Sequence, residues 1–241
     1  MDPSTPSTQP ELLPRQALES ATPSEVRRAI REQRWRGNTK KLALGRHQAN
    51  IAILPERYAF DFMRFCFRNP KALPLLDVTE PGDPTPRRAA PDADLRTDVG
   101  QYLVLRDGEA VERVSSIERI WRKDHVAFLT GCNLSMDRVM LEAGMPLPHL
   151  IDEQAFPAQF RSSIQCVPAG VFNGPMVVSL RPVAHELVVP LAELTSRYGL
   201  SHGAPVHIGD PSVIGINDLQ KVDRSEEHTS ELQSRQYLVC R

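Results

Sequence analysis

Two histidines and an aspartate near the C-terminal end are the residues best suited to moving protons. His202, His207 and Asp210 lie within nine positions of one another, in the string SHGAPVHIGDP. Histidine takes or gives a proton near neutral pH, and an aspartate can orient its ring. In a strand over residues 206–208, His207 would point away from its apolar neighbours, towards solvent or a cleft. The string predicts acid–base catalysis, although two structural histidines explain the same spacing equally well.

A second candidate is the segment GCNLS at residues 131–135, which leads from an apolar run into a helical pattern. A turn at a helix start presents free backbone N–H groups and the positive end of the helix dipole. Ser135 would help to hold a substrate carboxylate there, and Cys132 would ionise more readily than a free cysteine. The alternative is that Ser135 only caps the helix while Cys132 packs inside.

A third candidate is the loop PAGVFNGP at residues 168–175, which holds Gly170 and Gly174 between two prolines. Glycine lets a backbone approach a ligand closely, and proline stiffens a loop, so its N–H groups could face an oxyanion. A tight connection between strands would use the same residues. Arginine binds carboxylates through two hydrogen bonds, and the arginines that flank these segments therefore predict a small acidic substrate. They are Arg161, Arg181 and Arg197.

The familiar cofactor motifs do not occur in this sequence. It contains neither a Walker A motif nor G-x-G-x-x-G, so nothing predicts nucleotide binding. The His-Glu pair at 185–186 begins like a zinc-protease helix, but Val189 stands where the second histidine would be. Cys132, Cys166 and His207 lack the spacing of a zinc site. We therefore expect no metal and no cofactor.

The predicted helices and strands that must position these residues alternate along the chain. Thr22, Pro23 and Glu25 form a capping-box pattern that begins a helix. Cys66 lies on the apolar face of a second predicted helix and is expected to be a buried core residue. The interleaved order favours an α/β fold with a mixed sheet. The other predicted elements are a helix at 55–69, strands at 75–78, 126–129, 176–180 and 206–208, a hairpin at 101–115 and a helix at 136–143.

Composition excludes several classes of partner. The 29 basic and 30 acidic residues are nearly balanced, whereas nucleic-acid and membrane-surface binders carry a basic surplus. No apolar run is long enough for a membrane span, and the N-terminus lacks a signal-peptide pattern. The four cysteines are widely spaced, which indicates reduced thiols and a cytoplasmic location. A homo-oligomer is compatible with these numbers.

Several strings together resemble one family, the D-glutamate cyclase-like proteins, many of which are named only as hydro-lyases. The resemblance runs from about Pro23 to about Asp218 and includes LLDVTEPGDP, DLRTD, GCNLS, PAGVFNGPMVVSLRP and TSRYGLSHGAPVHIGDPSVIGI. It implies an α/β protein in which a three-layer sandwich domain carries a smaller two-layer α+β domain. The implied activity is loss of water from D-glutamate to give 5-oxo-D-proline, or a related lyase reaction.

The resemblance and the composition also predict how the chain is divided. Residues 1–21 are expected to be a disordered leader, and residues 22–223 the lyase-like region, with its smaller subdomain within about 100–190. From Arg224 the string RSEEHTSELQS resembles the translation of a sequencing adapter, so residues 224–241 are expected to be foreign and the chain truncated. A polar C-terminal helix is the alternative.

Two other functions remain open from the sequence alone. A hydro-lyase that eliminates water from a small hydroxy acid would use a histidine to remove a proton beside a carboxylate. A non-catalytic module that binds an acidic metabolite would use the same arginines and glycine loops.

Overall fold

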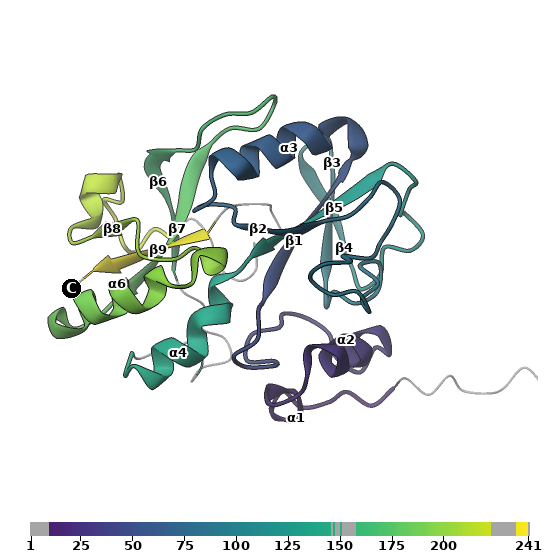
Figure 1. Ribbon diagram of the computed structural model, residues 1–241, viewed down its shortest axis with the longest axis horizontal. Coiled ribbons are helices and arrows are strands. Elements are labelled where there is room, and N and C mark those ends of the chain that lie inside the picture. The colour runs from purple at the N-terminus through teal and green to yellow at the C-terminus, as the bar shows by residue number, and fades with distance from the viewer. Residues whose placement is uncertain (1–9, 146, 148–149, 151–157, 223–234, 241) are drawn as a thin grey trace, which may run out of the picture.

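The apolar run at 126–129 forms the central strand of the first sheet (Figure 1). In the computed structural model, which describes residues 10–145, 147, 150, 158–222 and 235–240, β5 (His125–Gly131) pairs antiparallel with two strands. These are β1 (Ala49–Pro55) on one side and β2 (Leu75–Val78) on the other. Such a run suits a strand covered on both faces, and the prediction of a buried strand is confirmed.

Alternate residues of β5 enter two different cores. Phe128 faces helix α3 (Glu56–Arg68), where its ring lies 4.9 Å from that of Phe62 in an edge-to-face contact. Ala127 faces the opposite side and packs with Leu95. Cys66 on α3 is 1% exposed, and this burial raises the pKa of its thiol to about 12. The core role expected for Cys66 is therefore confirmed.

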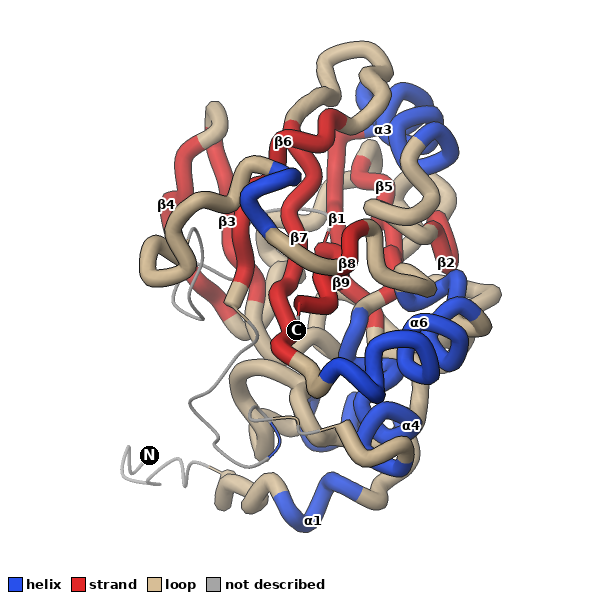
Figure 2. The backbone as a smooth tube through the Cα atoms, turned by 90° about the vertical axis from the view of Figure 1, so that its left-hand side faces the viewer, coloured by secondary structure: helices blue, strands red, loops and turns tan. Residues whose placement is uncertain are grey.

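A second sheet holds the strands that flank the candidate loops. Its order is β6-β7-β9-β8, with β6 antiparallel to β7 and β9 parallel to both β7 and β8. Figure 2 shows helices α4 and α6 side by side near one end of this sheet, where they share an apolar core. The bounds are β6 (Gln159–Gln165), β7 (Pro175–Pro182), β8 (His207–Ile208), β9 (Arg235–Cys240), α4 (Asp137–Glu142) and α6 (Val188–Ser196).

A hairpin and several short helices connect these larger elements. The predicted hairpin is confirmed as β3 (Tyr102–Arg106) and β4 (Glu109–Val114), which turn at Asp107 and Gly108, both with positive φ. Within the described residues, short 3-10 helices link the larger elements, and two of them are separated from the preceding β5 and α6 by one or two residues. They are η1 (Asn133–Met136), η2 (His185–Leu187), η3 (Gly199–Ser201) and η4 (Pro211–Ile214).

The N-terminal region is partly ordered where the sequence predicted a leader. Helix α2 (Pro23–Arg31) begins with the predicted capping box, in which Thr22 and Glu25 bond to each other's backbone N–H groups. Helix α1 (Gln16–Glu19) precedes it, and Leu18 packs into the same core with 4% exposure. The burial of Leu18 shows why the leader expected over 1–21 does not extend through residues 10–21. Residues 1–9 lie outside the described part.

The mixed α/β architecture agrees with the sequence. The three-layer domain, the two-layer domain and their boundaries stay predictions. Of the segment expected to be foreign, residues 224–234 and 241 lie outside the described residues, and residues 235–240 form β9. Within the described residues, no helix has the length and apolar character needed to cross a membrane.

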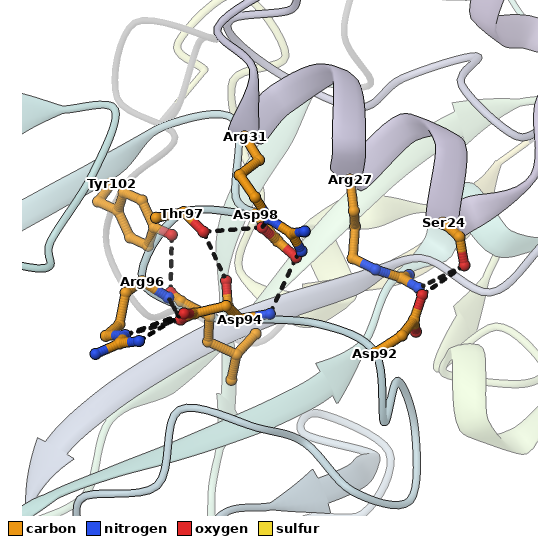
Figure 3. Close-up of polar contacts among 10 residues, drawn as sticks. Ser24, Arg27, Arg31, Asp92, Asp94, Arg96, Thr97, Asp98 and Tyr102 are labelled. Carbon is orange, nitrogen blue, oxygen red and sulfur yellow. Dashed lines mark hydrogen bonds and ion pairs between the residues drawn. The ribbon is translucent and has the colours of Figure 1, made fainter.

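Arginine–aspartate pairs attach α2 to the loop that holds the DLRTD string (Figure 3). Arg31 donates through Nε to Asp98, 2.8 Å away, and pairs with its second oxygen through Nη2. The Asp98 side chain is 1% exposed, so this pair is largely shielded from water on the aspartate side. One turn earlier, Arg27 and Ser24 each donate to Asp92 at 2.6 Å. The network holds the N-terminal helix against residues 92–98.

These pairs predict a loss of stability in acid. The Arg27 guanidinium and the Ser24 hydroxyl hold the pKa of Asp92 at about 2, below its usual value near 4. A carboxyl whose pKa is lower in the folded state stabilises the protein above its unfolded pKa, and this contribution disappears as pH falls through the folded value. We expect Asp92→Asn to lower Tm above about pH 4, with a difference from the wild type that shrinks towards pH 2.

The measurement is thermal unfolding of both proteins between pH 2 and pH 6. Glu112→Gln, on the exposed strand β4, is the control and should show a small difference that does not change with pH. A difference for Asp92→Asn that stays constant down to pH 2 would contradict the assignment.

Candidate functional site

Two of the three predicted segments meet at the end of β5. A Cβ atom placed on Gly131 would lie 1.7 Å from the carbonyl oxygen of Leu200, so η3 packs directly on the backbone of the GCNLS turn. This contact leaves Ser201 with 0% exposure and His202 with 3%. The polar groups of SHGAP are therefore inside the protein, against the GCNLS turn, and together these two segments form the centre of the candidate site.

His202 and Lys71 hold each other in place. The Nδ1 atom of His202 lies 3.1 Å from the backbone oxygen of Lys71, while Nζ of Lys71 donates to the backbone oxygens of His202, at 3.1 Å, and Ala204. Burial lowers the pKa of Lys71 because it disfavours the ammonium. When Nδ1–H donates to that carbonyl, Nε2 is the basic nitrogen of the ring. His202 also has φ +78°, a conformation uncommon for a non-glycine residue.

Of the three arginines predicted to bind substrate, Arg181 is the one whose side chain is buried. It lies near the end of β7, and its Nη2 is 3.9 Å from Oδ1 of Asp137, the first residue of α4. Both side chains are almost fully buried, with exposures of 6% and 1%. Arg161 and Arg197 are exposed. The interior therefore contains a cation, Arg181, next to a carboxylate, Asp137, that closely follows the GCNLS turn.

The sequence predicted free backbone N–H groups in the GCNLS turn. At three positions of the turn, the N–H group is instead hydrogen-bonded within the protein. The N–H of Gly131 donates to Pro74 at 2.8 Å, that of Cys132 to Gln48 at 3.1 Å, and that of Ser135 to Cys132 at 3.1 Å. Neighbouring backbone segments run alongside the turn and accept these bonds. The proposed anion site on these N–H groups is therefore wrong.

The side chains of the turn are engaged as well. Ser135 accepts a hydrogen bond from the N–H of Gln48 at 2.8 Å, which attaches the segment before β1 to the turn. Cys132 is 3% exposed, and its Sγ lies 3.3 Å from Oδ1 of Asn133, the geometry of a thiol that donates a hydrogen bond. Ser135 is thus a structural link, and Cys132 is buried with its thiol directed at a neighbouring amide oxygen.

The glycine loop lies at the other end of β7 from Arg181. Gly170 has φ +56°, and a Cβ there would meet the Asp61 carboxylate at 2.0 Å, so this glycine allows the loop to pack against α3. Phe172 of the same loop packs 5.0 Å from Phe62. Arg181 lies seven positions after Gly174 along β7, which corresponds to roughly 20 Å. An oxyanion site that combines this loop with Arg181 is excluded by that length.

His207 is held by Asp210, but through the backbone. Its Nε2 lies 2.8 Å from the carbonyl oxygen of Asp210, and the Asp210 carboxylate accepts the N–H of Ser212 at the start of η4. His207 is half-buried on β8. Asp210 thus orients the ring of this histidine through its backbone carbonyl, and the steering by its carboxylate stays a prediction.

A surface hollow of about 600 Å³ lies elsewhere, beside the network of Figure 3. Its charged lining residues include Arg31, Asp92 and Asp94, which are already paired with Asp98, Arg27 and Arg96. The residues predicted to do chemistry do not line it. We therefore assign the hollow no role in the candidate site. In the part of the chain described, no three His, Cys, Asp or Glu side chains gather as metal ligands do.

Comparison with known proteins gives the family. The sequence model of the family described as D-glutamate cyclase matches residues 126–234. A Bacillus subtilis protein named "Putative hydro-lyase YcsI" is 47% identical over 201 residues, which cover 83% of this chain and 78% of that protein. This chain belongs to the D-glutamate cyclase family. Proteins named "Putative hydro-lyase" from Stutzerimonas stutzeri (46% identical; 87% and 79% covered) and Verminephrobacter eiseniae (49%; 83% and 72%) are similar to it.

Some residues of the site carried no sequence signal. Lys71 follows α3 in a string without a catalytic pattern. Asp137 was the easiest to find, since it follows the GCNLS turn after one methionine. The signal for Asp137 is its position: a carboxylate that stands beside a candidate anion-binding turn is itself a candidate site residue.

The contact between Gly131 and Leu200 predicts a strong steric effect. Gly131→Ala places a methyl group on a backbone oxygen, which cannot rotate away, so we expect unfolding to become easier by more than about 3 kcal/mol. Gly199→Ala is the matched control, because a Cβ there meets no atom within 4 Å. Chemical denaturation of both variants measures the difference. Equal stability of the two would show that η3 does not pack on β5 in this way.

Proposed function

We propose that this protein is a hydro-lyase that closes D-glutamate to 5-oxo-D-proline with release of water. The observation that carries the proposal is a buried Arg181–Asp137 pair, next to the GCNLS turn, in a member of the D-glutamate cyclase family. The names of the relatives support the hydro-lyase class. A buried guanidinium suits a substrate with carboxylates, which it can bind through two parallel hydrogen bonds.

The reaction sets clear demands on the site. A bond forms between the amine nitrogen and the carbon of the side-chain carboxyl, and one oxygen of that carboxyl leaves. Two protons pass from the nitrogen to this oxygen, which departs as water, so no oxidant or reductant is needed. Holding the two ends of glutamate close together supplies much of the rate increase. A group that takes a proton from nitrogen and returns one to oxygen supplies more.

The buried residues of the candidate site carry the chemical groups that this reaction needs. Arg181 binds one carboxylate and, being buried, does so where charges interact more strongly than in water. Nε2 of His202 accepts the proton from nitrogen, since the Lys71 carbonyl engages Nδ1. The lysine ammonium braces the turn that carries this histidine. His207 is the second proton carrier proposed from the sequence.

The first experiment is a product assay with purified protein. D-Glutamate should give 5-oxo-D-proline by chiral chromatography, and Arg181→Met should lose turnover by at least about a hundredfold because a charged contact to the substrate is gone. Arg197→Met, an exposed arginine after α6, is the control and should keep full activity. An unsaturated acid formed from a hydroxy acid, seen by ultraviolet absorbance, would favour the elimination reaction instead. Stoichiometric binding without any product would identify a binding module.

A second experiment separates the two histidines. His202→Asn retains a residue type that tolerates positive φ, and we expect it to lower kcat by at least about a hundredfold. His207→Asn, which the sequence alone predicts to abolish turnover with the fold intact, is measured beside it. Thermal unfolding reports on the fold of each variant. Full activity of His202→Asn, with loss only in His207→Asn, would move the role of base to His207.

A further inference from the structure

Part of the polar face of β6 and β7 is buried. In an antiparallel sheet with one apolar face, the other face usually meets water. The apolar face here carries Phe160 and Val178, which pack with Ile214. The opposite face carries Gln159, paired in register with Ser179, and Arg181 two residues further along β7. Their exposures are 3%, 0% and 5%, respectively, so these three positions are as dry as the apolar face.

Two of these side chains have unused hydrogen-bonding atoms. Within the part of the chain that the structure describes, Oε1 of Gln159 and Oγ of Ser179 are buried and have no hydrogen-bond partner. Buried polar atoms are nearly always bonded, because an unmade bond is unfavourable, and an exception calls for a ligand or another specific reason. Both residues lie on the same sheet face as Arg181, whose Nη2 is 3.9 Å from Oδ1 of Asp137.

The chemistry of these atoms indicates what they would bind. An amide oxygen accepts hydrogen bonds, and a serine hydroxyl both accepts and donates. An amino acid presents an ammonium and a carboxylate on one carbon, a few ångströms apart. Side chains two residues apart on a strand lie at about 7 Å, which allows one to contact each group. Asp137 adds a negative charge that favours a cation.

We infer that Gln159 and Ser179 recognise the α-ammonium group of an amino-acid substrate whose α-carboxylate is bound by Arg181. This inference rests on the proposed function for the identity of the amino acid, D-glutamate, but not for the recognition of the amine itself. The two residues then determine specificity: an acid of the same length that lacks the amine leaves their atoms unpaired. A site of this kind rejects such analogues strongly.

The test uses Ser179→Ala and Gln159→Leu, two variants that remove the unpaired atoms. Without ligand, both should melt at a higher temperature than the wild type, by about 1 to 4 °C, because a buried unbonded polar group is replaced by an apolar one. Affinity for D-glutamate, measured by calorimetry, should fall about tenfold or more in each variant. Affinity for glutarate, which has no amine, should not change.

Ser162→Ala is the matched control. Ser162 is also buried on β6, with 5% exposure, but its hydroxyl donates to the carbonyl oxygen of Met176 at 2.8 Å. Loss of that bond should lower Tm and leave both affinities unchanged. A purely structural role for Ser179 would give the pattern of Ser162, so the opposite sign of the Tm change distinguishes recognition from packing.

The outcomes separate this inference from the proposed reaction. If the wild type binds D-glutamate or L-glutamate no more tightly than glutarate, or if the variants melt lower and bind D-glutamate as the wild type does, the inference is overturned, whatever the protein cyclises. If amine-bearing acids bind more tightly, the variants remove that preference and no 5-oxo-D-proline forms, the inference stands and the proposed reaction fails.

Discussion

The site depends on one close approach, that of the Leu200 carbonyl to the backbone of Gly131. Any side chain larger than hydrogen at this position would separate η3 from the end of β5, since the obstacle is a backbone oxygen. The approach buries Ser201 and His202 and places them beside the turn that leads to Asp137. Two segments about seventy residues apart in the sequence thus form one buried cluster, the candidate site, because a single glycine allows them to meet.

The second constraint is electrostatic. Taking Arg181 and Asp137 out of water is unfavourable, and their mutual attraction offsets only part of this, so a buried pair is weak evidence for stability. Lys71 is in a related position, with its ammonium held by backbone carbonyls and its pKa lowered by burial. Interiors keep such groups where a low local dielectric strengthens their contact with a substrate. Buried charged groups of this kind are therefore candidates for recognition rather than sources of stability.

Local structure was predictable because it follows from neighbouring residues. The capping box at Thr22, the turn at Asp107 and Gly108, and the buried strand after His125 depend on short patterns. The N-terminal leader was predicted too long, since the order of Leu18 comes from a core made by later residues. Arg161, Arg181 and Arg197 could not be ranked, because only the distant α4 distinguishes them. Patterns indicate which residues bear chemistry, whereas long-range packing decides which of them meet.

Strand length explains why the three candidate segments do not form one site. The glycine loop precedes β7 and Arg181 stands near its end, so the strand itself keeps them roughly 20 Å apart. A reaction centred on Arg181 therefore cannot place its developing negative charge on the N–H groups of that loop. Three N–H groups of the GCNLS turn already donate to backbone carbonyls. In the proposed reaction, stabilisation of an oxyanion on the side-chain carboxyl then falls to side chains, while Arg181 holds the α-carboxylate at that end of the strand.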